Sequence, residues 1–143
     1  MSAINAVETS ILLLIFNATA WADFAEDDSS SPLTEFYISL HTSDPGESGA
    51  QTTNETNYTS YARVSVARTS GGFTVSAGNV SNAALVTFIQ CTGGSSDVTH
   101  FGIGKDSSGA GTLYFRGTLD STLSVSNGIT PEFAIGALDV DLD

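Results

Sequence analysis

The alternation of apolar and polar residues with a period of two, from residue 33 to the end of the chain, most constrains the fold. In "LTEFYISLHT" (33–42), Ile38 and Leu40 fall on one side, and His41 falls on the other. Side chains of a β-strand point alternately to the two faces of a sheet, so this pattern predicts half-buried strands. Similar runs occupy 33–42, 61–68, 72–77, 84–90, 98–104, 112–119, 122–126 and 131–143. The run 84–90 is almost continuously apolar, which predicts a central strand covered on both faces.

The segments between these runs are rich in turn-forming residues. They read "TSGG", "SAGNVSN", "TGGSSD", "KDSSGAG" and "SNGITP". Glycine and asparagine tolerate positive φ, and aspartate and serine can bond to their own backbone. About eight short strands separated by such turns indicate a mainly β protein. The expected fold class is an antiparallel β-sandwich or barrel-like domain of about eight strands with one N-terminal α-helix.

The N-terminal apolar segment "ILLLIF" admits two interpretations, a secretory signal or a helix. The first ten residues contain no lysine or arginine and include Glu8, which is unlike the basic start of a signal peptide. The segment is also too short to span a bilayer. We therefore expect a helix from about Ala3 to Ala18. Its apolar stripe would comprise Ile4, Val7, Ile11, Leu14 and Ile15, widened by Leu12, Leu13 and Phe16. Such a wide apolar surface favours packing on more than one neighbour, of which a second subunit is one option.

The chain divides into three parts by composition. Residues 1–22 form the predicted N-terminal helix and arm. The segment "DFAEDDSSSP" (23–32) is acidic and serine-rich, which is typical of a solvated linker. Residues 33–143 form the predicted β-sandwich domain.

The charge of the chain limits its partners. Sixteen acidic residues face four basic residues in 143, for a net charge of −12. Direct binding to nucleic acid requires a basic surface, so the sequence predicts no nucleic-acid partner. The same charge argues against binding an anionic membrane surface. An acidic exterior fits a well-solvated protein or one that docks on a complementary partner.

Recognisable catalytic and cofactor motifs are absent from the sequence, which contains no phosphate loop, dinucleotide fingerprint, paired-histidine zinc motif or nucleophile elbow. The stretch "SLHTSDPGESG" brings His41, Asp44 and Glu47 close together, as an acid–base or metal site would. Asp44-Pro45-Gly46 is also turn chemistry, and we interpret the stretch as a strand end followed by a turn. A glycan hydrolase using Asp44 and Glu47 is the weaker alternative. The C-terminal "DVDLD" places carboxylates in a row, which favours a solvated edge strand over a calcium site. The sequence thus predicts no enzyme, cofactor or metal.

Candidate interface residues combine the apolar N-terminus with a group of aromatic and basic residues. Tyr58, Tyr61 and Arg63 are of the types enriched at protein interfaces, although tyrosine is also common in ordinary strands. His41 and His100 occupy outward positions of predicted strands and are expected to be hydrogen-bonding surface or interface residues. The full candidate set is Ile11, Leu12, Phe16, Trp21, His41, Tyr58, Tyr61 and Arg63.

The order of several segments resembles a known family. They read "YISLHTSDPGESG", "NYTSYARVSV", "VSNAALVTF", "VTHFGIG", "GAGTLYFRGTL" and "GITPEFAIGALDVDLD", after an N-terminal helix. This series is similar to a family of small tailed-bacteriophage virion proteins, whose members are labelled tail-fibre, structural or head-decoration proteins. The resemblance covers nearly the whole chain, and its motifs are structural.

The resemblance implies a non-enzymatic component of the virion. The first expectation is a capsid decoration, or cement, protein on the outside of the head. It would bind the major capsid protein, form homotrimers and stabilise the capsid lattice. The alternative is a tail-, collar- or fibre-associated structural or receptor-binding protein. In that case Tyr58, Tyr61 and Arg63 are candidate contacts.

Overall fold

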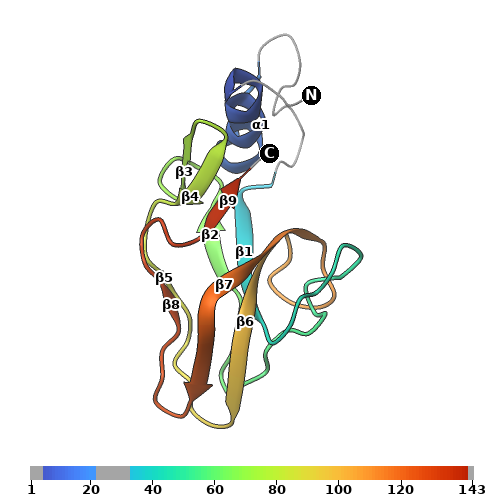
Figure 1. Ribbon diagram of the computed structural model, residues 1–143, viewed down its shortest axis with the longest axis vertical. Coiled ribbons are helices and arrows are strands. Elements are labelled where there is room, and N and C mark those ends of the chain that lie inside the picture. Colours follow the sequence, from blue (N-terminus) through green and yellow to red (C-terminus); the bar gives the residue numbers. More distant parts are fainter. Residues whose placement is uncertain (1–4, 22–32, 142–143) are drawn as a thin grey trace. The chain divides into compact units, whose positions relative to one another are not determined.

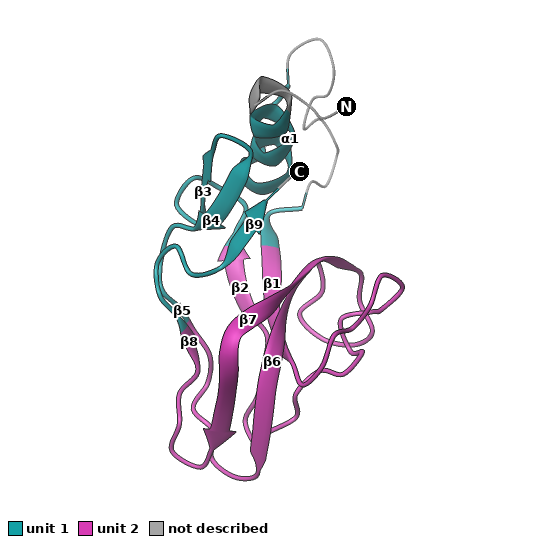
Figure 2. Cartoon of the chain, in the orientation of Figure 1, with its two compact units in different colours: residues 1–35, 67–86, 133–143 teal, residues 36–66, 87–132 magenta. Residues whose placement is uncertain are grey.

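The computed structural model describes residues 5–21 and 33–141, which contain one helix and nine strands (Figure 1). The chain forms two compact units (Figure 2). Unit 1 comprises residues 1–35, 67–86 and 133–143, and unit 2 comprises residues 36–66 and 87–132. The predicted acidic linker, 23–32, lies outside the described residues, and the three-part division of the chain stays a prediction.

Unit 2 is built on a four-stranded sheet with the order β2-β1-β6-β7. Its strands are β1 (Glu35–His41), β2 (Val64–Ala67), β6 (Ser95–Gly104) and β7 (Leu113–Ser126). β6 pairs antiparallel with both β1 and β7, and His41 lies directly opposite His100. The two predicted strands 112–119 and 122–126 are therefore one long strand, β7.

β7 is an edge strand with two irregularities in its pairing with β6. The register passes from Ile103↔Phe115 to Gly104↔Leu113, so Tyr114 is an extra residue on β7. A second shift separates Val98 from His100 on β6. Bulges bend a strand and interrupt its row of backbone groups, and they are a common way to prevent edge strands from pairing with other chains.

Unit 1 contains a three-stranded antiparallel sheet with the order β3-β4-β9. Its strands are β3 (Phe73–Ser76), β4 (Asn79–Asn82) and β9 (Asp139–Asp141). Ala77 and Gly78 join β3 to β4 with φ values of 49° and 84°, the positive φ at both positions that a two-residue type I′ hairpin requires. The sequence interpretation of "SAGNVSN" as a turn holds for Ala77 and Gly78 but was wrong for the residues that follow, which form β4. The single apolar residue of β4, Val80, is enough to fill its core position.

The predicted N-terminal helix is present as α1 (Asn5–Asn17). Its buried positions differ from the predicted stripe: Leu12 and Phe16 are fully buried, whereas Ile11, Leu14 and Ile15 are half-buried. Leu12 and Phe16 are four residues apart and so share one face of a helix. That face packs on the β3–β4 hairpin, where the Phe16 ring meets Phe73 edge-on at 4.9 Å. The surface on which α1 packs, rather than the mean direction of all its apolar side chains, decides which face of the helix is buried.

Arg68 closes the C-terminal end of α1. Its guanidinium donates to the carbonyls of Leu14 and Ile15, and its Nη1 lies 3.0 Å from the Leu33 carbonyl. Carbonyls in the last turn of a helix have no partner within the helix and carry its negative dipole end, so a cation is favoured there. This largely buried arginine therefore ties α1 to the segment that enters β1.

The remaining strands, β5 (Val86–Thr87) and β8 (Glu132–Phe133), form a two-stranded sheet. The prediction of a doubly covered central strand over 84–90 was wrong. Leu85 and Ile89 are each 53% exposed, while Val86 and Phe88 are buried, so the run alternates despite its apolar composition. The predicted fold class is confirmed, since the protein is mainly β with antiparallel sheets and one N-terminal helix, in agreement with the β-sandwich class.

Candidate functional site

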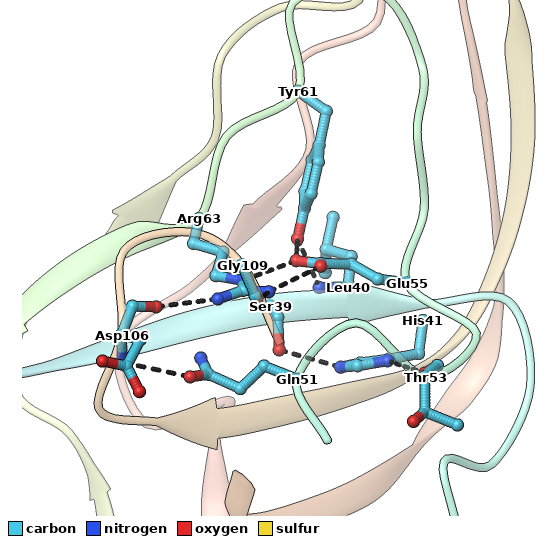
Figure 3. Close-up of polar contacts among 10 residues, drawn as sticks. All are labelled: Ser39, Leu40, His41, Gln51, Thr53, Glu55, Tyr61, Arg63, Asp106 and Gly109. Carbon is cyan, nitrogen blue, oxygen red and sulfur yellow. Dashed lines mark hydrogen bonds and ion pairs between the residues drawn. The ribbon is translucent and has the colours of Figure 1, made fainter. Parts of the chain in front are cut away.

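Unit 2 carries two exposed loops, 42–56 and 105–112, that rest on a network of buried polar side chains (Figure 3). We call these two loops the loop platform. The alternation in the sequence predicted an outward, exposed position for His41, and this prediction was wrong. Ser39 and His41 are fully buried, because loop 42–56 folds back over the polar face of β1. The Thr56 N–H donates to the Leu40 carbonyl at 2.9 Å and fixes this return.

His41 links β1 to the middle of loop 42–56. Its Nδ1 lies 2.8 Å from the Thr53 carbonyl, which can only accept, so Nδ1 carries the proton. Nε2 then accepts from the Ser39 hydroxyl at 2.8 Å. Burial lowers the pKa of His41, and this outweighs the opposing effect of the Thr53 carbonyl. A neutral, fully buried histidine with both ring nitrogens bonded supports the loop.

Arg63 joins the two loops of the platform. Its Nε and Nη2 bind the two Glu55 carboxylate oxygens at 2.7 and 2.8 Å. Its Nη1 and Nη2 also donate to the carbonyls of Asp106 and Gly109, at 2.9 and 2.7 Å. The Arg63 side chain is only 3% exposed. One guanidinium therefore satisfies groups from both loops, an arrangement that its planar fork of donors permits and that lysine lacks.

Tyr61 completes the environment of Glu55. Its hydroxyl donates to Glu55 Oε1 at 2.8 Å and accepts from the Leu40 N–H at 3.1 Å. Burial raises the pKa of Tyr61. The Tyr58 ring packs edge-on against Tyr61 at 5.3 Å, and burial raises the pKa of Tyr58 to about 12. Both phenols are therefore neutral donors at physiological pH.

Gln51, on loop 42–56, packs its side chain against loop 105–112. Its Oε1 accepts from the Asp106 N–H at 3.0 Å, and its side chain is fully buried. Gly104 and Gly111 leave the room that it needs, because a methyl group on either would lie within 2.3 Å of a Gln51 side-chain atom. Gln51 Nε2 is the one buried side-chain polar atom without a hydrogen-bond partner among the described residues.

At the exposed end of loop 42–56, the Asp44-Pro45-Gly46 turn is held by its own backbone and by β7. Asp44 Oδ1 accepts from the Gly46 N–H at 2.8 Å, and Gly46 has a φ of 76°. Arg116 binds both Asp44 oxygens at 2.7 and 2.8 Å and also bonds to Glu47. The Gly46 N–H and then Arg116 hold the pKa of Asp44 below its usual range. The interpretation of this stretch as a strand end and a turn is confirmed.

The structure distributes the candidate interface residues over both units. Leu12 and Phe16 lie in the core of unit 1, and Ile11 and Trp21 are half-buried there. His41, Tyr58, Tyr61 and Arg63 lie in unit 2 beneath the platform rather than on its surface, and their role in an interface stays a prediction. Sequence reasoning missed Gln51, Glu55, Tyr114 and Arg116. The scarcity of basic residues was a signal for the arginines, because in so acidic a chain each arginine is expected to pair with a carboxylate. The sequence does not show which carboxylate is the partner, because the two residues of a pair are distant along the chain.

The acidic row at the C-terminus behaves as an edge-strand face. Asp139 and Asp141 are exposed on β9, the edge of its sheet, and Asn79 Nδ2 donates to both carboxylates. Within the described residues, no group of three or more His, Cys, Asp or Glu side chains could hold a metal ion. In the same part of the chain, no helix is long and apolar enough to cross a membrane.

Comparison with protein families shows the family to which the chain belongs. A family model described as podophage GP4 fiber I protein gp80 matches residues 2–141. The chain belongs to this family. Members of the fiber I family are structural proteins of the phage particle, so the resemblance to small bacteriophage virion proteins is confirmed, as is a virion-associated role. A search of curated proteins gave no match.

Proposed function

We propose that this protein is a non-enzymatic component of a bacteriophage fibre and that the loop platform contacts a neighbouring particle protein. The observation that carries the fibre assignment is the match of almost the whole chain to a family described by a fibre protein. The platform supplies a suitable contact surface, because Arg63 and His41 hold its loops from below and Gln51 bonds one loop to the other. Loops that are ordered before binding lose less conformational entropy when a partner binds.

The carboxylates of the platform support a structural role rather than glycan hydrolysis. A general acid of a glycosidase requires a raised pKa, whereas the pKa of Asp44 is lowered. Asp44 and Glu47 also share one partner, Arg116, instead of facing each other across a groove. The Ser39–His41 pair is fully buried, which does not suit direct contact with a substrate.

A capsid decoration protein is the second candidate function. The net charge of −12 favours it, because an acidic protein is repelled by packaged DNA and suits the outer surface of a head. In this role the protein would bind the major capsid protein. A homotrimer would bind through several contacts at once, which raises its avidity. A trimer is compatible with either location.

Copy number and position in the particle separate the two candidates. Densitometry of purified virions and immunogold labelling with antibody to this protein measure both. A fibre component is expected in few copies, with gold at the tail. Labelling spread over the head, with a copy number that follows the major capsid protein, would favour decoration and overturn the fibre assignment. Light scattering of the purified full chain tests the trimer, and a monomer at all concentrations would exclude it for the free protein.

A further inference from the structure

The turn that follows β7 in unit 2 carries a chemically reactive pair of residues, Asn127 and Gly128. Among the asparagines of the chain, only Asn127 is followed by glycine. Asparagine is thermolabile because its side-chain amide can be attacked by the backbone nitrogen of the next residue. Glycine has no side chain to hinder this attack, so the reaction is fastest in an Asn-Gly sequence. Asn127 is exposed, so water has access to it.

The folded chain holds this pair in a tight turn. The Ile129 N–H donates to the Ser126 carbonyl at 2.9 Å, and Gly128 has the positive φ, 89°, that the third residue of a type II turn requires. Two further bonds restrain Gly128 itself. Its N–H donates to the Cys91 carbonyl at 2.8 Å, and its carbonyl accepts from Gln90 Nε2 at 2.9 Å. Both peptide groups that flank Gly128 are therefore held by hydrogen bonds.

Deamidation of Asn127 requires the Gly128 nitrogen as its nucleophile. This nitrogen loses its proton to hydroxide and bonds to Cγ of Asn127, while the Cγ–Nδ2 bond breaks and ammonia leaves. Water then opens either carbonyl of the resulting cyclic imide, which gives aspartate or isoaspartate. In the folded turn the Gly128 N–H is bonded to the Cys91 carbonyl, so the nitrogen is not free to lose its proton or to move toward Cγ. The reaction therefore depends on local opening of the turn.

We infer that Asn127 is a deamidation site of this protein and that the bonds of Gly128 to Cys91 and Gln90 restrain the reaction in the folded chain. The product adds a carboxylate to an exposed turn, and isoaspartate also adds one carbon to the backbone. The added carbon shifts Gly128 away from its two partners, so the turn cannot re-form these bonds. The modification thus marks chains in which this turn has opened. The inference goes beyond the proposed function and holds for either position in the virion.

The test compares the folded full chain with the same chain in guanidinium chloride, both kept in mildly alkaline buffer. Peptide mass spectrometry follows the conversion of Asn127 to aspartate and isoaspartate over time. The expected rate is about tenfold lower in the folded chain, because the two bonds of Gly128 must break first. Equal rates in the two states would overturn the restraint by the turn. An Asn127 that reacts no faster than the other asparagines of the unfolded chain would overturn the site.

Gln90→Ala isolates one of the two bonds. It removes the donor for the Gly128 carbonyl and is expected to speed deamidation in the folded chain about fivefold. Thr92→Ala is the matched control, because Thr92 is exposed in the same segment but its hydroxyl bonds to Ser60 and the Thr59 carbonyl instead of the turn. The control should leave the rate unchanged.

Far-UV circular dichroism checks that both variants fold, as expected for exposed side chains. Equal acceleration by the two variants, or none by Gln90→Ala, would overturn the restraint by Gln90. None of these results alters the copy number or the position in the virion, which test the proposed function separately.

Discussion

Arg63 binds both carboxylate oxygens of Glu55, with Nε 2.7 Å from Oε1 and Nη2 2.8 Å from Oε2. The two side chains are 3% and 13% exposed. Charges this far from water are costly unless paired and fully hydrogen-bonded, and here the Tyr61 hydroxyl and two loop carbonyls complete the set. The pair holds the loop platform together, so its loss should produce a measurable change in the free energy of unfolding.

Arg63→Met is expected to lower the free energy of unfolding by about 3 kcal/mol, because it leaves Glu55 buried without its cation and frees two carbonyls of loop 105–112. Urea denaturation followed by circular dichroism measures the change. Arg116→Met is the matched control, since Arg116 also binds two carboxylates but is more exposed. Its effect on stability should be much smaller, because solvent screens exposed pairs. Equal losses for the two variants would contradict the structural role of Arg63.

Acid is expected to weaken unit 2 through His41. Burial holds the pKa of folded His41 below its ordinary value of 6.5, which the unfolded chain retains. The unfolded state therefore binds the proton more readily, and stability falls as the pH drops below that value and through the folded pKa. Urea midpoints for the wild type and His41→Gln, taken between about pH 7 and pH 5, measure this dependence. The variant should have a flatter profile, and His100→Gln serves as a control on the opposite strand.

Gly104→Ala is expected to destabilise the protein by about 2 kcal/mol through overpacking. The new methyl group would lie 2.2 Å from Gln51 Cδ, and Gln51 is enclosed on all sides. Gln51→Ala removes that clash, so the double variant should be more stable than the sum of the two single losses predicts. Thermal unfolding of the four proteins completes the cycle.

Gly71→Ala controls for the general effect of adding a methyl group, because its nearest neighbour there would be at 3.6 Å, an ordinary contact. Strictly additive losses in the Gly104–Gln51 cycle would show that the two residues do not compete for space.

Arg68→Met is expected to loosen α1 selectively. The substitution removes the donors for the Leu14, Ile15 and Leu33 carbonyls, at a cost of about 2 kcal/mol. Hydrogen exchange should show faster exchange of α1 amides, with little change in β6. Uniform loss of protection in both elements would indicate instead that Arg68 supports the whole chain.

Much of the fold follows from the sequence because it depends on local patterns. Alternation in 33–42 and 98–104 located β1 and β6, and the apolar N-terminal segment located α1. The Asp44-Pro45-Gly46 turn was predictable because its hydrogen bond joins residues two apart. Alternation failed where composition conceals it, as in β5, whose neighbours Leu85 and Ile89 are apolar and yet exposed.

The sequence by itself determined the strand-rich class, the N-terminal helix and the acidic character of the surface, since each depends on composition or on neighbours within a few residues. Only the tertiary structure decided which polar residues are buried. Glu55, Arg63 and Asp106 meet because loop 42–56 folds back over β1 while loop 105–112 closes from β6. Arg116 reaches Asp44 across 72 positions of sequence. Partners so far apart along the chain leave no local pattern, and the pairing of β1, β6 and β7 in one sheet brings them together.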